Sequence, residues 1–209
     1  MKIILTSKVF GDKEATQSIF SLMDKDVLLL KVLLVATPCL PYGPEKYLNE
    51  LINCGFKSEN IIVFNHEMAS DYCNLDIDAV YVTGGNTFTG LKLIKECNFD
   101  KEIIRYINND VTYIGRSAGS HIASRNIEHV LEFDSNDIGA TDFDGLGLID
   151  GILVCHYDDS RVKTFNKLVS DKKYNVYSLT NQEILVYDGV EIKKIMPSNV
   201  KFEGSHFNK

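Results

Sequence analysis

The fold of this 209-residue sequence is decided by the stretch Tyr113-Ile114-Gly115-Arg116-Ser117-Ala118-Gly119-Ser120. A short apolar run leads to a serine with glycines two positions before and after it, and the helix-compatible segment Ser120–Arg125 follows. A strand that turns sharply into a helix through G-x-S-x-G is the setting of a nucleophile elbow, where larger flanking residues would collide with the turn. The stretch therefore predicts an α/β fold in which Ser117 is a nucleophile above the carboxyl ends of the strands.

Short apolar runs alternate with amphipathic segments through the first two-thirds of the chain. Apolar residues at helical spacing predict helices over Asp12–Met23, Glu45–Cys54 and Thr87–Glu96. The runs have the composition of strands buried on both faces, and they are Ile3–Thr6, Val32–Ala36, Ile61–Phe64, Ala79–Thr83 and Thr112–Ile114. Alternation of this kind predicts a mostly parallel sheet with helices on both faces.

The last third of the chain changes character. Asp134–Gly151 is rich in Asp and Gly, and we interpret it as an irregular excursion near the active site. Beyond it we expect a strand over Ile152–Cys155, a helix over Arg161–Ser170 and a strand over Asn175–Thr180. Asp188-Gly189 separates Ile184–Tyr187 from Val190–Ile195 and predicts a C-terminal β-hairpin. No Pro- or Ser-rich linker divides the sequence, so we expect a single domain over residues 1–209.

Charge and hydropathy exclude two classes of partner. A net charge of −7 and a pI near 5.2, without any run of Lys and Arg, argue against nucleic acid. Val27–Ala36 is apolar, but Lys31 interrupts it and it is shorter than the roughly 20 residues that span a bilayer. The N-terminal segment reaches Lys8 too soon for the core of a signal peptide. We therefore expect a cytoplasmic protein without a nucleic acid or a membrane as partner.

The five cysteines are odd in number and form no C-x-x-C pair. This spacing favours reduced thiols over a disulfide framework or a zinc site. We expect no metal and no organic cofactor.

A second glycine turn, Gly84-Gly85-Asn86-Thr87, follows the expected strand Ala79–Thr83. The backbone N–H of Ala118, at a helix N-terminus, and that of Gly85 are candidate donors to an oxyanion. Taken alone, the turn is equally compatible with a simple strand-to-helix connection capped by Asn86 or Thr87, but beside Ser117 the oxyanion interpretation is favoured. A nucleotide-phosphate site is a third interpretation, although neither G-x-G-x-x-G nor G-x-x-x-x-G-K-[ST] is present.

A serine nucleophile needs a base, and histidine has a suitable pKa. His156 is favoured because it follows the expected strand Ile152–Cys155 and should emerge at the same sheet edge as Ser117. His121 lies one helical turn past Ser117 and should point away from substrate. His66 also follows a strand and is a weaker candidate, His129 is a further histidine of the sequence, and His206 sits in a polar tail. A carboxylate should orient the imidazole, and Glu132, Asp134, Asp158 and Asp159 all remain open for that role.

Three segments, in this order and spacing, resemble the peptidase E family of serine peptidases. They are Gly84-Gly85-Asn86-Thr87-Phe88, Tyr113-Ile114-Gly115-x-Ser117-Ala118-Gly119 and Phe143-Asp144-x-Leu146-x-Leu148, followed by His156. The resemblance implies a parallel α/β sheet related to class I glutamine amidotransferase domains, with serine in place of their cysteine. It also implies hydrolysis of short peptides from the amino end, typically dipeptides that begin with aspartate.

The resemblance also implies roles for individual residues. Ser117 would be the nucleophile and His156 the base, with Gly85 and Ala118 as oxyanion donors. The third member of the relay would fall at Glu132, or at Asp134 if the loop is registered differently. Arg161 matches an arginine that binds the substrate aspartate, although a salt bridge to Asp158 or Asp159 is the alternative, and Asn86 is a further candidate contact to substrate. Arg116 departs from the family, since many members carry an aromatic residue there.

The sequence therefore predicts a serine peptidase that acts on a small peptide substrate through a Ser-His-Glu or Ser-His-Asp relay and an acyl-enzyme. An esterase or isopeptide hydrolase would use the same groups. A catalytically silent domain that binds a small ligand is the alternative from another class, and a nucleotide binder is a third. A homodimer is neither supported nor excluded by the sequence.

Overall fold

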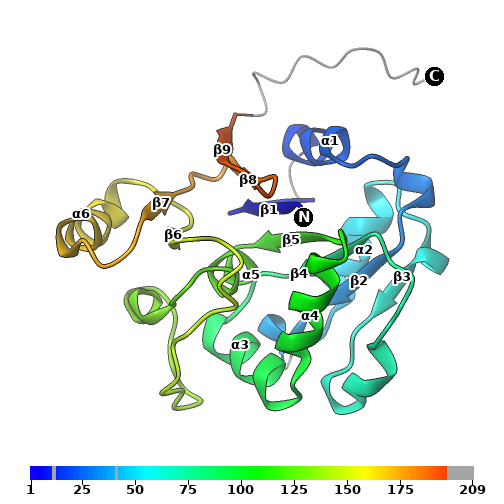
Figure 1. The fold of residues 1–209 in the computed structure, drawn as a ribbon, viewed down its shortest axis with the longest axis horizontal. Helices are drawn as coiled ribbons and strands as arrows, with labels where there is room; N and C mark the ends of the chain where they lie inside the picture. The colour runs from blue at the N-terminus through cyan, green and yellow to red at the C-terminus, as the bar shows by residue number, and fades with distance from the viewer. Residues whose placement is uncertain (11–12, 41, 197–209) are drawn as a thin grey trace.

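The computed structural model of the chain describes residues 1–10, 13–40 and 42–196. Its central feature is a seven-stranded sheet with the strand order β3-β2-β4-β5-β1-β8-β9 (Figure 1). The first five strands are parallel, and β8 and β9 add an antiparallel hairpin beside β1. The strands are β1 Ile3–Thr6, β2 Val32–Val35, β3 Ile61–Val63, β4 Ala79–Val82, β5 Thr112–Arg116, β8 Ile184–Tyr187 and β9 Ile192–Ile195.

The apolar runs of the sequence become strands because both faces of the sheet are covered. Along β1, Ile3 and Leu5 pack into one hydrophobic cluster and Ile4 packs into the other, and all three are fully buried. Successive side chains of a strand point to opposite faces, so a strand covered on both sides needs an unbroken apolar run. The mostly parallel α/β sheet predicted from the sequence is confirmed.

Helices α1 and α2 cover one face of the sheet, and α3, α4 and α5 cover the other. The helices are α1 Lys13–Leu22, α2 Glu45–Asn53, α3 Thr87–Glu96, α4 Phe99–Asn108, α5 Ala118–Ile122 and α6 Val162–Asp171. Short 3-10 turns are η1 Val27–Leu29, η2 Thr37–Cys39, η3 Ser58–Asn60, η4 His66–Tyr72, η5 Glu128–Glu132 and η6 Asp159–Arg161. The first residue of the helix expected over Asp12–Met23 lies outside the described residues.

Two parts of the architecture differ from the sequence prediction. The sequence assigned no element to the residues of α4, which follows α3 after two residues, Cys97 and the left-handed Asn98. The strand β6 (Ile152–Val154) does not join the central sheet but pairs in parallel with β7 (Val176–Ser178) in a separate sheet. Figure 1 shows this small sheet beyond the carboxyl ends of β1 and β5, with α6 outside it.

The excursion expected over residues 134–151 is irregular, as predicted. Between η5 and β6 the structure has no helix or named strand, and residues 134–151 are all within its described part. Hydrogen bonds from Gly145 N to Arg125 O and from Leu146 N to Ile122 O attach the excursion to the end of α5. Its apolar residues Leu146 and Ile149 are buried in the core, which fixes the loop on the α5 side of the sheet.

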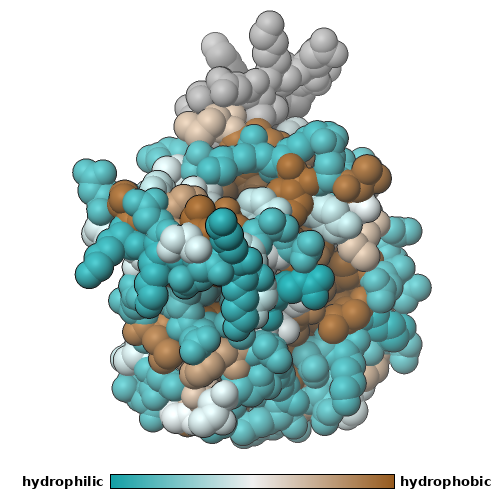
Figure 2. Space-filling view, turned by 60° about the vertical axis from the view of Figure 1, so that its left-hand side comes forward, coloured by the Kyte–Doolittle hydropathy of each residue, from teal (hydrophilic) through white to brown (hydrophobic). Residues whose placement is uncertain are grey.

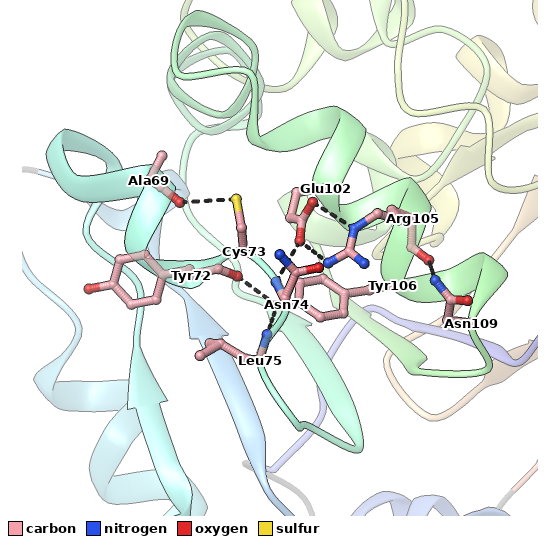
Figure 3. Close-up of polar contacts among 9 residues, drawn as sticks. All are labelled: Ala69, Tyr72, Cys73, Asn74, Leu75, Glu102, Arg105, Tyr106 and Asn109. Atoms are coloured by element: carbon pink, nitrogen blue, oxygen red, sulfur yellow. Dashed lines mark hydrogen bonds and ion pairs between the residues drawn. The ribbon is translucent and has the colours of Figure 1, made fainter.

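A polar cluster joins α4 to the segment that enters β4 (Figure 3). The hydroxyl of Tyr106 donates to the carbonyl of Tyr72 at 2.6 Å and accepts from the N–H of Leu75 at 2.8 Å. The N–H of Asn74, which has a positive φ of 61°, donates to the carboxylate of Glu102. These contacts stabilise the amino end of β4, at the opposite edge of the sheet from Ser117.

The face shown in Figure 2 is mainly hydrophilic, and its hydrophobic residues lie in separate groups between hydrophilic ones. None of the helices in the described part of the chain has the length and apolar character needed to span a bilayer.

Candidate active site

Ser117 lies at the junction of β5 and α5 in a backbone conformation that few residues adopt. Its φ is 49° and its ψ is −106°, outside the regions that L-residues favour. A strained residue of this kind costs on the order of 1–3 kcal/mol and persists only where its surroundings hold it. The N–H of Ser117 donates to Thr6 O at 2.8 Å, and its carbonyl accepts from the N–H groups of Ser120 and His121. The helix begins at Ala118, two residues earlier than the sequence predicted.

The two glycines of the motif are required by close backbone contacts. A Cβ at Gly119 would lie 2.1 Å from the carbonyl oxygen of Val82, and one at Gly115 would lie 2.9 Å from the carbonyl of Gly119. Neither contact is possible for a real side chain, since van der Waals contact begins near 3.5 Å. The glycines therefore allow α5 to pack against β4 and β5 while Ser117 turns toward the sheet edge.

Ser117 and His156 are in hydrogen-bond contact although they belong to different sheets. Oγ of Ser117 lies 2.8 Å from Nε2 of His156. His156 follows β6 after Cys155 and also has a positive φ, 51°. Its N–H donates to the hydroxyl of Ser7 at 2.8 Å. His156 therefore lies beside Ser117, as expected, but it follows a strand of the small sheet and not one of the central sheet.

The group that orients His156 is an amide. Oδ1 of Asn181 lies 2.7 Å from Nδ1 of His156. Asn181 follows β7, the strand that pairs with β6, so the two residues emerge side by side from neighbouring strands. An amide oxygen accepts a hydrogen bond, which favours the tautomer with the proton on Nδ1 and leaves Nε2 free to accept the proton of Ser117. The sequence analysis missed Asn181 because it considered only carboxylates.

The expectation that Glu132 orients His156 is wrong for this structure. The carboxylate of Glu132 accepts a hydrogen bond from the hydroxyl of Thr164 in α6. The fallback, Asp134, accepts from the N–H of Thr87 at 2.9 Å and from its hydroxyl at 2.6 Å. The carboxylate of Asp158 accepts a hydrogen bond from the N–H of Ser160 and caps η6. Asp159 is the first residue of η6. Among the described residues, Nδ1 of His156 has Asn181 as its partner and none of these carboxylates.

The second glycine turn lies against the nucleophile. A Cβ at Gly84 would lie 3.4 Å from Cβ of Ser117, and Gly85 has a φ of 139° with Pro38 O only 2.0 Å from a Cβ built there. Within the described residues, the N–H groups of Gly85 and Ala118 have no hydrogen-bond acceptor. Their role as oxyanion donors stays a prediction.

Asn86 and Arg161, the two expected substrate contacts, are engaged with the protein itself. Asn86 Oδ1 accepts from Thr89 N and caps α3, and its Nδ2 donates to Ser135 O at 2.7 Å. Nη1 of Arg161 donates to Cys155 O at 2.7 Å, and its guanidinium lies 4.0 Å from the centre of the Phe133 ring. Among the described residues no ion pair joins Arg161 to Asp158 or Asp159.

The other histidines lie away from the reacting atoms. His121 is buried beneath the elbow, and its Nε2 accepts from the N–H of Cys155 at 3.3 Å. The ring of His129 packs edge-on against it at 5.7 Å, and burial lowers the pKa of both histidines. His66 begins η4, and His206 lies outside the described residues.

The environment of His156 favours its neutral, basic form. Burial lowers the pKa of His156 below its ordinary value of 6.5, the hydrogen bond to Asn181 opposes this, and the charges of Arg161, Lys8 and Arg116 lower it further. A neutral imidazole is the form that can take a proton from Ser117. Burial also raises the pKa of the neighbouring Cys155 thiol to about 12, so this cysteine is a poor nucleophile.

Arg116 places a fixed cation next to Ser117. Its guanidinium forms an ion pair with Glu50 of α2 and lies 5.0 Å from the centre of the Tyr47 ring. A Cβ at Gly84 would lie 3.1 Å from the Tyr47 hydroxyl, so this group also borders the elbow. The aromatic residue expected from the family at position 116 is thus replaced by an arginine that packs on an aromatic ring.

These groups can carry out acyl transfer. A strained serine hydroxyl, a neutral imidazole with an oriented ring and nearby backbone N–H groups are the parts that a covalent hydrolytic mechanism uses. No group of three or more His, Cys, Asp or Glu side chains in the described part of the chain is arranged to hold a metal ion.

Comparison with known proteins gives a family match. The model of peptidase family S51 matches residues 45–195. An uncharacterized peptidase of Listeria monocytogenes is 36% identical over 120 residues, and a peptidase E of Nostoc sp. is 27% identical over 155 residues. These matches cover 55% and 72% of this chain. They span only 58% and 60% of the lengths of the two curated relatives.

A solved structure gives a longer match. The crystal structure of a candidate peptidase E protein from Listeria monocytogenes EGD-e superposes with a TM-score of 0.76 and 26% sequence identity. The superposition covers 93% of this chain and 98% of the other. The similarity therefore extends over nearly the whole chain.

Proposed function

The chain belongs to peptidase family S51, and we propose on this basis that it is a serine peptidase that hydrolyses short peptides. The observation that carries the proposal is the 2.8 Å contact between Oγ of Ser117 and Nε2 of His156. The two groups come from different sheets, and each is held in an uncommon backbone conformation. Backbone strain at both members of a hydrogen-bonded pair supports a catalytic role for that pair.

In the first step, Nε2 of His156 takes the proton of the Ser117 hydroxyl while Oγ bonds to the carbonyl carbon of the scissile peptide. The carbonyl π electrons move to the oxygen, which becomes an oxyanion. The N–H groups of Gly85 and Ala118 are the proposed donors to this oxyanion, and losing one such donor typically lowers the rate about 10²–10³-fold.

In the second step, His156 returns the proton to the leaving amine as the C–N bond breaks. The product is an ester between the acyl group of the substrate and Ser117. Water then hydrolyses the ester by the same two steps. His156 takes a proton from the water molecule while the water oxygen attacks the ester carbonyl. Ser117 regains its proton when the acid product leaves, so the enzyme is restored.

Asn181 gives the base its orientation without adding a charge. The amide oxygen holds the Nδ1 proton and keeps Nε2 directed at Ser117. A carboxylate in this place would also stabilise the imidazolium that forms during the reaction. With a neutral amide, that stabilisation has to come from the surrounding dipoles, so we propose a slower enzyme than one with a carboxylate relay.

Short peptides are the proposed substrate class, without a requirement for aspartate. Relatives in Nostoc sp. and Haemophilus influenzae are named peptidase E, which supports peptide hydrolysis at this site. Arg161 donates to a backbone carbonyl and packs on Phe133, so its guanidinium is committed to the protein. This commitment favours a broader choice of amino-terminal residue.

A serine-reactive fluorophosphonate tests the proposal without knowledge of the substrate. The folded protein should gain the mass of one phosphonyl group on Ser117, and Ser117→Ala should gain none. His156→Gln should react much more slowly, since general base catalysis contributes about 10²–10⁴-fold. A folded wild-type protein that stays unlabelled would instead favour a silent ligand-binding domain.

A further inference from the structure

The proposed catalytic groups are divided between two sheets that share no strand pairing. Ser117 follows β5 of the central sheet, whereas His156 and Asn181 follow β6 and β7 of the small sheet. A catalytic hydrogen bond requires its groups to be held within roughly 0.5 Å of the productive geometry. The contacts that join the two sheets therefore decide whether Ser117 and His156 meet.

Ser7 makes such a contact to the residues that follow the two strands of the small sheet. It follows β1, and its side chain is fully buried. Its hydroxyl accepts from the N–H of His156 at 2.8 Å and donates to the carbonyl of Leu179 at 2.9 Å. Leu179 comes directly after β7, two residues before Asn181. One hydroxyl thus connects the end of β1 to the segments that present the base and its orienting group.

The hydrogen bonds around Ser7 continue into the small sheet. The Leu179 carbonyl that accepts from Ser7 also accepts from Tyr157 N at 2.9 Å, and Leu179 N donates to Val154 O at 2.9 Å. These bonds tie the residues after β6 to those after β7. A shift of the Ser7 hydroxyl would therefore move His156 and Asn181 together relative to Ser117.

Two further side chains hold the backbone of Cys155, the residue before His156. Nε2 of His121 accepts from the N–H of Cys155, and Nη1 of Arg161 donates to the carbonyl of Cys155. With Ser7 on the N–H of His156, three side chains fix this short turn. His156 adopts a positive φ of 51° there, a conformation that needs such support.

We propose, on the basis of the proposed function, that Ser7 is a positioning residue. It fixes the position of the small sheet, and so of His156 and Asn181, relative to Ser117. Ser7 takes no part in bond making, because both hydrogen-bonding directions of its hydroxyl are used by the backbone. It acts through His156, whose Nε2 must stay within hydrogen-bond reach of Ser117, and through Leu179, which leads to Asn181.

Ser7→Ala tests this role, with Ser124→Ala as the matched control. Ser124 is also a fully buried serine, but its hydroxyl makes no hydrogen bond among the described residues. We expect kcat of Ser7→Ala to fall about 10–100-fold, a part of what general base catalysis contributes, while KM changes less than about twofold. Ser124→Ala should behave as wild type. Ser7→Thr restores the hydroxyl and should recover most of the lost kcat.

A second readout does not depend on turnover. The Nδ1 proton of His156, assigned in NMR spectra by its loss in His156→Gln, should give a protected low-field resonance in wild type and in Ser124→Ala. In Ser7→Ala the resonance should broaden or disappear, and Ser7→Thr should restore it. If Ser7→Ala keeps both its kcat and this resonance, Ser7 is only a packing residue. If wild type hydrolyses no peptide, the proposed function fails, and the resonance still decides the role of Ser7.

Discussion

Nδ1 of His156 lies 2.7 Å from Oδ1 of Asn181, so an uncharged amide orients the imidazole that faces Ser117. The amide fixes the tautomer of His156 as a carboxylate would, but it adds no negative charge beside the ring. Together with burial, this absence of charge is consistent with the lowered pKa of His156. The difference between an amide and a carboxylate can be measured directly.

Asn181→Asp should raise the pKa of His156, because a negative charge next to Nδ1 favours the protonated imidazole. The acidic limb of the kcat/KM profile reports the base in the free enzyme and should move to higher pH. Asn109→Asp, which adds the same charge at the end of α4, is the control and should leave the profile unchanged. An apparent pKa that stays constant or falls in Asn181→Asp would show that residue 181 does not contact His156 in solution.

The stability of the fold should decline in acid because of His121 and His129. Burial lowers the pKa of both in the folded protein, while the unfolded chain has the ordinary value near 6.5. Above pH 6.5 both states are neutral, so stability is constant. Below that pH the unfolded chain takes up protons first, and the free energy of unfolding should fall by up to about 1.4 kcal/mol per pH unit for each histidine.

Urea unfolding between pH 8 and pH 5 measures this loss. His129→Gln should reduce the slope below pH 6.5 by about a third, since His121 and His156 also have a lowered pKa and remain. His66→Gln, which changes a partly exposed histidine at the start of η4, is the control. A slope that is equal in all three proteins would mean that other groups cause the acid sensitivity.

Gly119→Ala should destabilise the protein more than a typical glycine replacement. The new Cβ would lie 2.1 Å from Val82 O, a backbone atom that cannot move without shifting β4. The expected loss is about 3 kcal/mol or more, at the upper end of overpacking effects. In Gly139→Ala the Cβ would meet nothing within 4 Å, so only the strain of a positive φ remains, about 1–2 kcal/mol. Equal losses in thermal or urea unfolding would contradict the close packing of the elbow.

Glu50→Gln should destabilise the fold by leaving Arg116 without its partner. The side chains of Arg116 and Glu50 are 11% and 19% exposed, so water screens the unpaired charge poorly. We expect a loss of roughly 3 kcal/mol, the lower end for a broken buried pair. The double variant Glu50→Gln/Arg116→Met should recover much of it, because the uncompensated charge is removed. A double variant that is no more stable than Glu50→Gln would show that packing on Tyr47, and not charge, determines the effect.

The fold was predictable wherever burial leaves a local pattern. The strands of the central sheet are apolar on both faces, so their sequences alone locate them within two residues. The whole of α4 was missed, and Asn98 stands where a glycine or proline would have marked the turn between α3 and α4. The separate pairing of β6 with β7 could not be predicted, because a short apolar run does not encode its neighbour.

The site was predictable only in part, for the same reason. The contact between Ser117 and His156 follows from a motif and from a histidine placed directly after a strand. Asn181 lies 25 residues beyond His156 in the sequence, and only the pairing of β6 with β7 brings it to the ring. Glu132 has a suitable side chain, but Thr164 of α6 occupies its carboxylate.

The most direct test of the central claim is hydrolysis of a panel of X-Leu dipeptides by the wild-type protein and by Ser117→Ala, both shown to be folded. The proposed mechanism predicts turnover by wild type across several amino-terminal residues, and no turnover above background by Ser117→Ala. Equal activity in the two proteins, or turnover that survives the loss of Ser117, would contradict the assignment of Ser117 as the nucleophile.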